Sequence, residues 1–183
     1  CLREIERLDR VVGGALSMGR DRAFARVPCS VHQILGDALD VVRAQLEQHQ
    51  VAVATSFVAP DDRVEGDTES LKAVFLNLFL NAAEAMPGGG RLSVSTERAV
   101  RARRARDILR VRVADTGVGV PVAARERIFE PFYSTKPQGT GFGLPVALRT
   151  VEEHGGRLLL AAEDRGGAVF LVELPLAAEG MPA

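Results

Sequence analysis

The chain has 183 residues, of which 46% are hydrophobic and 26% charged, and its formal net charge is −1. This composition is typical of a globular protein with one full-sized domain, and the near-zero charge gives no general reason to expect nucleic acid or an anionic membrane as a partner. The two cysteines, Cys1 and Cys29, exclude a disulfide framework and favour a reducing compartment.

The first residues have the pattern of an amphipathic helix. Ile5, Leu8, Val12 and Ala15 recur at helical spacing between charged residues over 2–16. Because the chain begins inside this pattern and has no initiator methionine, we expect a fragment of a longer protein. No stretch reaches the ~18 uninterrupted apolar residues of a membrane span, and no signal peptide is found, which leaves the longer protein's targeting open.

Polar residues with a glycine and a proline then break the helical period over 17–28. We therefore expect a helix that ends a longer hairpin, a linker, a globular domain and a short tail, at 1–18, 19–29, 30–176 and 177–183.

Further helices are predicted from capping residues and hydrophobic periodicity. Ser30 is a suitable N-cap for the first and Asp67 for the second, which stops at MPGGG. The helices are expected at 30–48, at 68–86 and from the GTGFGLPVA stretch (139–147) to HGG (154–156), with a short one near 122–127.

Alternating and aliphatic runs predict strands at 51–58, 91–97, 108–115, 157–163 and 167–175, with a turn-rich segment at 59–67. This order of elements predicts a mixed sheet covered by helices on one face, a two-layer α/β sandwich. Between two strands lies a run of arginines that we expect to be a solvated loop rather than a docking patch for an acidic partner: Arg98, Arg101, Arg103, Arg104, Arg106 and Arg110.

The helix predicted at 68–86 is apolar almost all round except for one polar stripe. Ser70, Asn77, Asn81 and Glu84 fall within an arc of about 60°. In a buried helix these side chains need partners. One buried asparagine usually ties down a neighbouring loop, but two asparagines followed by Glu84 favour a site for a hard cation such as Mg²⁺, shared with substrate phosphates.

A strand ends at Asp115 in VADTGVGVP, and Gly117 and Gly119 follow in the turn. Glycines let a flat ligand approach the backbone, and a carboxylate can accept a hydrogen bond from the N6 amine of adenine but not from the carbonyl oxygen of guanine. An ordinary Asp-Gly turn would have the same residues.

The GTGFGL stretch lines a helix N-terminus with glycines, which is a natural site for an anion such as phosphate. It has neither the Gly-Lys-Ser/Thr of a Walker A loop nor the spacing of a Rossmann fingerprint. By itself the pattern also fits a flexible loop. Lys136, just before it, could add a cation for a terminal phosphate.

Taken in order, NLFLNAAEAM, DTGVG, IFEPFYSTK and GTGFGL resemble the N box, first glycine box, F box and second glycine box of sensor histidine kinases. The resemblance covers about residues 50–175, and REIERLDRVV resembles the end of the family's dimerisation hairpin. EPFYSTK is nearest to the nitrogen-regulation type. The resemblance implies the Bergerat ATP-binding fold, with Mg²⁺-ATP under a mobile lid between the F box and the second glycine box.

The resemblance also implies roles for single residues. Asn81 would be the Mg²⁺ ligand, with Asn77 near the phosphates and the metal, and Asp115 would read the adenine N6 beside a wall shaped by Gly117 and Gly119. Glu84, from the same polar stripe, is expected to belong to this nucleotide site. Phe129 and Phe132 would pack the base of the lid, Lys136 would reach the phosphates, and the lid hinge and helix start would consist of Gly139, Thr140, Gly141, Gly143 and Leu144.

The implied activity is that of a protein-histidine kinase. The γ-phosphoryl group would pass to a histidine on a separate hairpin of the same or a partner protomer, and then to the receiver domain of a response regulator. The full-length protein would be a homodimer with this domain in the cytoplasm, with no nucleic-acid partner and with membrane anchoring left open.

The sequence departs from a complete kinase because the family's phosphoacceptor motif is absent. His32 lacks the acidic context of an acceptor, His49 resembles a solvated helix end, and His154 is expected at a helix C-terminus. This chain alone is therefore expected to bind ATP without phosphorylating itself. The alternatives are a serine kinase of the anti-sigma type with the same fold, and a nucleotide-sensing interaction module whose catalysis has lapsed.

Overall fold

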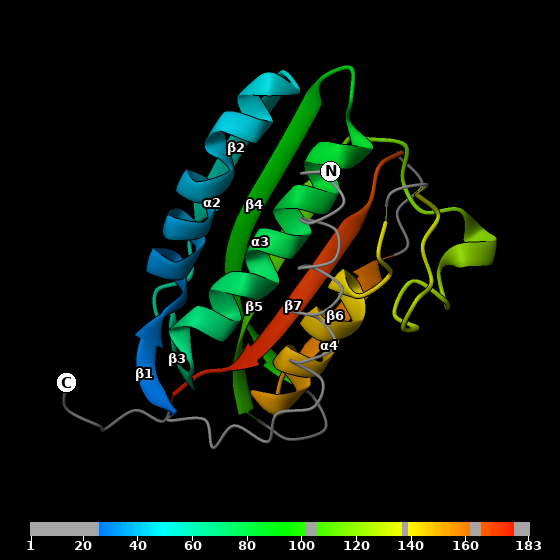
Figure 1. The fold of residues 1–183 in the computed structure, drawn as a ribbon. Helices are drawn as coiled ribbons and strands as arrows, with labels where there is room; N and C mark the ends of the chain where they lie inside the picture. The colour runs from blue at the N-terminus through cyan, green and yellow to red at the C-terminus, as the bar shows by residue number, and fades with distance from the viewer. Residues whose placement is uncertain (1–25, 102–105, 137–138, 162–165, 178–183) are drawn as a thin grey trace.

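A computed structural model describes residues 26–101, 106–136, 139–161 and 166–177. The helix expected over 2–16, the linker up to residue 25 and the tail from residue 178 lie outside the described residues. Within the described part, three α-helices cover one face of a larger sheet, and a small second sheet lies at one end (Figure 1). This arrangement confirms the predicted two-layer α/β sandwich.

The larger sheet has five strands in the order β2-β4-β5-β7-β6. β2 pairs in parallel with β4, and the other neighbours pair antiparallel, so the sheet is mixed as predicted. All five strands expected from the sequence are present. Their bounds are Val51–Phe57 for β2, Gly90–Arg101 for β4, Arg106–Asp115 for β5, Arg157–Ala161 for β6 and Val169–Pro175 for β7.

The small sheet corrects the sequence-based expectation. β1 (Val27–Ser30) pairs antiparallel with β3 (Arg63–Gly66), although the first lies partly in the expected linker and the second in the segment expected to be turns. Both strands are four residues long and carry proline, charge or glycine, so neither has a strand pattern of its own. Their pairing with each other, across a large sequence separation, makes them strands.

The helices agree closely with the expected ones. They are α2 (Val31–Gln48), α3 (Thr68–Ala85) and α4 (Gly143–Glu153), and a single 3₁₀ turn, η1, covers Val122–Ala124. Both predicted caps are present: Ser30 Oγ accepts a hydrogen bond from the N–H of Gln33, and Asp67 Oδ1 accepts one from the N–H of Ser70. The hydrogen bond from the Ser70 amide lowers the pKa of Asp67, as expected for a carboxylate at a helix N-terminus.

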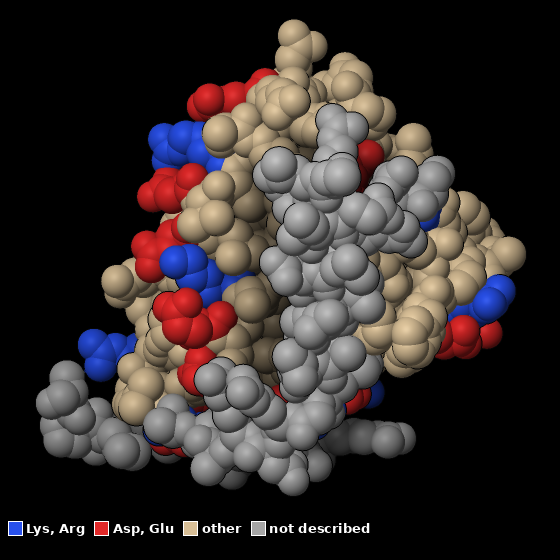
Figure 2. Space-filling model, viewed as in Figure 1, with Lys and Arg blue, Asp and Glu red and all other residues tan. Residues whose placement is uncertain are grey.

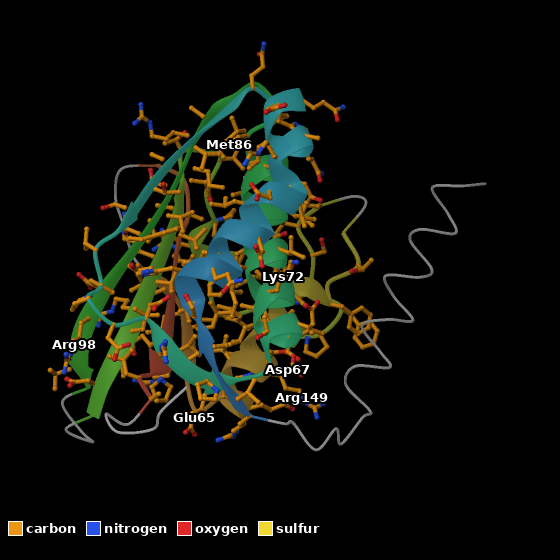
Figure 3. The ribbon with its side chains drawn as sticks, turned by 90° about the vertical axis from the view of Figure 1, so that its left-hand side faces the viewer. Glu65, Asp67, Lys72, Met86, Arg98 and Arg149 are labelled. Atoms are coloured by element: carbon orange, nitrogen blue, oxygen red, sulfur yellow. The ribbon has the colours of Figure 1, made fainter. Side chains whose placement is uncertain are left out.

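The hydrophobic core lies between α3 and the larger sheet. α3 buries Phe75 and Phe79 completely, with their rings stacked at a centroid distance of 6.4 Å. Leu76 and Leu80, on the remaining sides, are partly buried against the same core. Figure 3 shows the two layers edge on, with Asp67 and Met86 marking opposite ends of α3. α3 is thus packed on most of its circumference, which leaves its polar stripe as the part open to chemistry.

His154 joins the end of α4 to the start of α3. It is 5% exposed; its Nδ1 donates to the carbonyl oxygen of Thr150 at 2.7 Å, and its Nε2 accepts from the N–H of Asp67 at 3.0 Å. The predicted place at the helix C-terminus is confirmed, since His154 is the C-cap of α4. The ring fits because residue 66 is glycine: a Cβ there would lie 2.5 Å from Cδ2 of His154.

Gly66→Ala is therefore expected to lower the free energy of unfolding by about 1–3 kcal/mol, because the added methyl group forces the buried imidazole out of its place. Urea denaturation of the two proteins measures this difference. Gly88→Ala serves as the control, since a Cβ at residue 88 meets no atom within 4 Å. Equal destabilisation of both variants would contradict the proposed role of the space at Gly66.

The described ends of the arginine-rich segment are strands, whereas residues 102–105, with Arg103 and Arg104, lie outside the described residues. β4 continues to Arg101 and β5 starts at Arg106, so Arg98 and Arg110 lie in strands and not in a solvated loop. Arg98 forms an ion pair with Asp107 across the strands. Arg110 bonds to Glu97 at 2.9 Å and to the buried Glu173 at 2.9 Å; the hydrogen bonds, that to Glu173 above all, raise the pKa of the guanidinium. Cross-strand pairing thus neutralises these two arginines.

The surface along α2 carries mixed charge. Acidic and basic side chains alternate along this edge of the molecule, with no large field of one sign in the part of the view that is described (Figure 2). Among the described residues, no helix is long and apolar enough to cross a membrane.

Candidate functional site

The polar stripe of α3 brings two asparagines and a glutamate together on one half-buried face. Asn81 Nδ2 lies 3.4 Å from Asn77 Oδ1 in a long hydrogen bond, and Glu84 follows one turn later. Ser70, which the sequence places on the same stripe, lies in the first turn of the helix, where its N–H donates to the cap Asp67. The cluster is therefore made by the C-terminal half of α3.

Lys136 reaches this cluster from the loop that follows β5. Its Nζ donates to Glu84 Oε2 at 2.6 Å and to Asn81 Oδ1 at 3.1 Å. The backbone N–H of Lys136 donates to Ser134 Oγ, which holds the loop in a tight turn. The sequence places Lys136 near phosphates, but its contacts with α3 were not expected from the motif.

The glycine-lined start of α4 lies directly against the cluster. Gly143 is the first residue of α4, and a Cβ at this position would collide with Asn77 Oδ1 and lie 2.9 Å from its Nδ2. Glycine therefore lets the first turn of α4 approach the asparagine without displacing its side chain. The free N–H groups of this turn, which favour anions, therefore lie close to the amide side chains of α3. Leu144, the next residue, packs against the core.

The F-box loop and the GTGFGL stretch are tied together. The N–H of Phe132 donates to the carbonyl oxygen of Gly141 at 3.0 Å, and a Cβ at residue 141 would collide with the Phe132 backbone. Gly141 and Phe132 both have positive φ, of 69° and 68°. This conformation suits glycine but is uncommon for phenylalanine.

The two phenylalanines of the F box differ in how deeply they are buried. Phe129 is partly buried against the core, whereas Phe132 is 77% exposed and meets Phe142 edge to face at a centroid distance of 4.7 Å. Earlier in the stretch, Thr140 Oγ1 accepts from the N–H of Phe142 at 3.5 Å, and a Cβ at Gly139 would collide with Ser134 Oγ. These contacts are compatible with the packing role that the resemblance implies for the lid base.

Asp115 ends β5 in a buried position and is 8% exposed. Its Oδ1 accepts hydrogen bonds from the N–H groups of Gly117 at 2.8 Å and Ala168 at 3.2 Å, while Oδ2 receives no donor from the described residues. Burial raises the pKa of the Asp115 carboxyl, although the two amide hydrogen bonds oppose this shift. The carboxylate is thus held in a fixed orientation with one oxygen left for a ligand.

The wall beside Asp115 depends on glycines that pack closely on other backbone. A Cβ at Gly117 would lie 2.5 Å from the carbonyl oxygen of Ala85, and one at Gly119 would lie 2.7 Å from that of Gly167. Gly167 has a φ of 79°, and a Cβ there would collide with the carbonyl oxygen of Asp115. Gly117 and Gly119 therefore allow the acidic turn to fit between α3 and the β6–β7 hairpin.

Gly167 and Ala168 contact Asp115, which the sequence did not predict. The sequence predicts strands at 157–163 and 167–175 with a turn between them, and nothing local to this turn points to Asp115, which lies 53 residues before Ala168 in the chain.

The oxygen ligands of the cluster fit a cation. Among the described residues there is no group of three or more His, Cys, Asp or Glu suited to a metal, so a metal would depend on the Asn81 amide oxygen and the Glu84 carboxylate. These are hard oxygen donors of the kind that Mg²⁺ prefers. Both already bind a positive group, the Lys136 ammonium.

His32 and His49 lie near the two ends of α2. His32 stacks on Phe57 and bonds through Nε2 to Thr96 Oγ1 at 2.8 Å, while its Nδ1 lies 3.5 Å from Asp62. These contacts give His32 a structural role at the start of α2. His49 is the C-cap of α2, a helix end as predicted.

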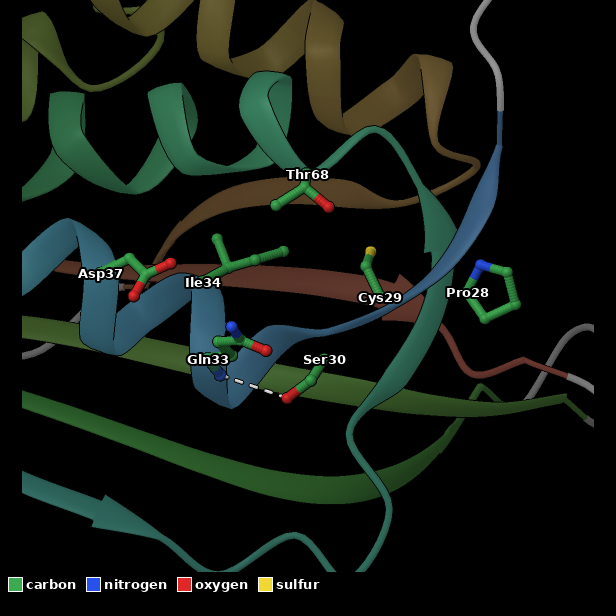
Figure 4. Close-up of a pocket in the computed structure, with 7 residues that line it drawn as sticks. All are labelled: Pro28, Cys29, Ser30, Gln33, Ile34, Asp37 and Thr68. Carbon is green, nitrogen blue, oxygen red and sulfur yellow. Dashed lines mark hydrogen bonds between the residues drawn. The ribbon is translucent and has the colours of Figure 1, made fainter. Parts of the chain in front are cut away.

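Away from the asparagine cluster, a cleft of about 250 Å³ lies between the N-terminal ends of α2 and α3 (Figure 4). Cys29, Gln33, Ile34 and Thr68 are among its lining residues. None of the predicted site residues lines it. Burial raises the pKa of the Cys29 thiol, so this cysteine is a poor nucleophile.

Residues 66–178 match the family described as histidine kinase-, DNA gyrase B- and HSP90-like ATPases. Sporulation kinase C of Bacillus subtilis (strain 168) is 35% identical over 174 residues, which are 94% of this chain and 39% of that protein. Sensor histidine kinase ZraS of Salmonella typhimurium is 30% identical over 176 residues, 96% of this chain and 37% of that protein. The chain therefore spans less than two fifths of the length of these two relatives.

Solved structures have the same fold. The nucleotide-free catalytic domain of histidine kinase ThkA superposes with a TM-score of 0.70 at 27% identity, covering 82% of this chain and 95% of that one. ThkA in complex with response regulator protein TrrA gives a TM-score of 0.78 at 24% identity, over 95% of this chain and 48% of that one. The chain belongs to the family of histidine kinase-, DNA gyrase B- and HSP90-like ATPases, and its fold is that of a histidine kinase catalytic domain.

Proposed function

We propose that this chain binds ATP with Mg²⁺ and positions the γ-phosphoryl group for transfer to a histidine on a separate helical hairpin. The observation that carries the proposal is the convergence of three kinds of group at one end of α3: the asparagine amides, the Lys136 ammonium and the glycine-lined N-terminus of α4. Phosphoryl transfer needs mainly positioning and charge neutralisation, and these groups can supply both.

Each group has a distinct role in this proposal. Oδ2 of Asp115 accepts the N6 amine of adenine and so selects against guanine. The N–H groups at the start of α4 hold the phosphates, and Lys136 adds a positive charge to them. Asn81 would hold Mg²⁺ with Asn77 beside it, and the ion would supply positive charge that neutralises the phosphate oxygens.

Asn77 also bears on the fate of the phosphoryl group. Its side-chain amide is a poor general base, so Asn77 cannot activate water for attack on ATP. We therefore propose transfer to a protein histidine with little hydrolysis. The names of the related kinases support this reading over a serine kinase of the anti-sigma type or a lapsed nucleotide sensor.

The partners and location follow from the same reading. We propose a hairpin histidine of the same or a partner protomer as acceptor, the receiver domain of a response regulator as the next carrier, and a homodimeric full-length kinase. ThkA, which shares the fold, was solved in complex with a response regulator. Because ATP is the proposed substrate, we place the domain in the cytoplasm.

Two measurements test the proposal. ADP or ATP with Mg²⁺ is expected to raise the melting temperature of the chain, whereas GTP with Mg²⁺ is not. When a separate histidine hairpin is supplied with ATP labelled at the γ-phosphate, that hairpin is expected to gain label that survives base and is lost in acid, as phosphohistidine does. Acid-stable, alkali-labile label would instead identify a serine kinase, and no response to any nucleotide would refute the proposal.

A further inference from the structure

The Lys136 ammonium occupies a position that a metal ion would need. Its Nζ lies 2.6 Å from Glu84 Oε2 and 3.1 Å from Asn81 Oδ1. The two oxygens come from residues three apart on one face of α3, so the helix itself sets their spacing. Lys136 comes from a loop 52 residues further along the chain, so no local sequence preference accounts for this contact.

The amide oxygen of Asn81 is held toward this position. Its Nδ2 donates to Asn77 Oδ1, which leaves Oδ1 of Asn81 to face the cation, and the Asn77 side chain is itself in close contact with Gly143. Among the described residues, the Glu84 carboxylate has no other cationic partner. The ammonium is therefore the group that neutralises this carboxylate.

We propose that Asn81 and Glu84 together form a divalent-cation site, and that Lys136 fills this site in the nucleotide-free protein in competition with the metal. The inference rests on the proposed function for Asn81 as a metal ligand. It adds Glu84 as a second ligand and Lys136 as the occupant that must leave.

The competition follows from elementary electrostatics. The ammonium and a divalent cation are both positive and repel each other, so they compete for the same two oxygens. A divalent cation alone therefore binds weakly. A nucleotide changes this balance, because its phosphate oxygens offer the ammonium another anionic partner and offer the metal further ligands. The metal consequently enters with the nucleotide.

The size of the effect is limited by exposure. The Lys136 and Glu84 side chains are 36% and 42% exposed, so their ion pair is screened by water and contributes little to the stability of the fold. Removing the lysine charge is expected to leave the fold intact and to tighten metal binding by roughly threefold to fivefold.

The test uses Mn²⁺ as the probe and the full 183-residue chain without nucleotide, with free Mn²⁺ measured by electron paramagnetic resonance. Lys136→Met is expected to bind Mn²⁺ about threefold to fivefold more tightly than the wild type, and Lys136→Arg, which keeps the charge, is expected to bind as weakly as the wild type. Adding Glu84→Gln to Lys136→Met is expected to remove the gain.

Lys72→Met is the matched control. It removes the only other lysine, which lies in the first half of α3 (Figure 3), about 14 Å along the helix from Asn81. Its Mn²⁺ affinity is expected to equal that of the wild type. Circular dichroism checks that each variant is folded.

Unchanged Mn²⁺ affinity in Lys136→Met would overturn the inference, as would an equal gain in Lys72→Met or a gain that survives Glu84→Gln. These outcomes are separate from failure of the proposed function, which is read from the response of the wild type to ADP with Mg²⁺. If the wild type binds ADP with Mg²⁺ but Lys136→Met does not change the Mn²⁺ affinity, the proposed function stands and only this inference is wrong.

Discussion

Asp115→Asn is expected to abolish the thermal stabilisation that ADP with Mg²⁺ gives the wild-type chain. Oδ1 of Asp115 accepts two backbone N–H groups, from Gly117 and Ala168, so the oxygen of an asparagine will keep that position. The amide NH₂ then takes the place of Oδ2 and faces the N6 donor of adenine. Two opposed donors in a buried site lose the hydrogen bond and leave both groups unsatisfied, which weakens ADP binding by about 100-fold or more.

The same substitution makes a second, opposite prediction for guanine. Guanine has a carbonyl oxygen where adenine has its amine, so the new NH₂ can donate to it. GDP with Mg²⁺ is expected to bind Asp115→Asn at least as well as it binds the wild type, and isothermal titration with both nucleotides measures the two affinities. Wild-type affinity for ADP in the variant would refute the assignment of Asp115 to adenine.

The stability of the nucleotide-free protein gives an independent test of the role of Asp115. Burial raises the pKa of this carboxyl above its value in the unfolded chain. The protonated carboxyl therefore stabilises the folded state below the unfolded pKa, and this stabilisation is lost as the pH rises through the folded pKa. At neutral pH the buried charge therefore destabilises the free protein. Asp115→Asn is expected to melt at a higher temperature than the wild type at pH 7, with a difference that shrinks in acid. Loss of nucleotide binding together with higher stability would separate a binding role from a folding role.

The sequence predicted those parts of the fold whose signals are local. Ser30 and Asp67 were identified as caps because a capping side chain acts within three residues of itself, and both make the expected hydrogen bond. α3 was recognisable because its apolar residues surround a narrow polar stripe. β1 and β3 were missed because their strand conformation depends on pairing with segments far away in the sequence, mainly with each other.

In the candidate site, too, residues with a local signal were predictable from the sequence, and residues that depend on distant contacts were not. Asn77, Asn81 and Asp115 stand out because a polar residue in an apolar run needs a partner. Gly167 does not stand out, because its constraint is the carbonyl oxygen of Asp115, which folding brings close to it. The contact between Lys136 and Glu84 was also not predictable, since it depends on the path of a whole loop.

Gly143→Ala is expected to weaken binding of ADP with Mg²⁺ by about tenfold or more while leaving the free energy of unfolding within about 1 kcal/mol of the wild type. A Cβ at residue 143 collides with the end of the Asn77 side chain, which is flexible and half-buried and can move aside. Alanine also favours the helix relative to glycine, which offsets the cost of this movement. The displaced amide can then no longer support Asn81 or meet the phosphates, so the loss falls on the ligand.

Gly36→Ala provides the control for helix propensity. Gly36 lies in α2, and a Cβ there meets no atom within 4 Å, so this variant is expected to gain about 0.5–1 kcal/mol of stability and to bind ADP as the wild type does. Urea denaturation and ADP titration are measured on both variants.

A double-mutant cycle with Asn77→Ala then identifies the cause of the loss. If Gly143→Ala acts by displacing the Asn77 side chain, it has no further effect on ADP binding once that side chain has been removed. Additive losses would mean that the methyl group instead blocks the approach of phosphate to the N-terminus of α4. Wild-type affinity in Gly143→Ala would contradict both mechanisms, because the glycine would then serve neither the asparagine nor the phosphate.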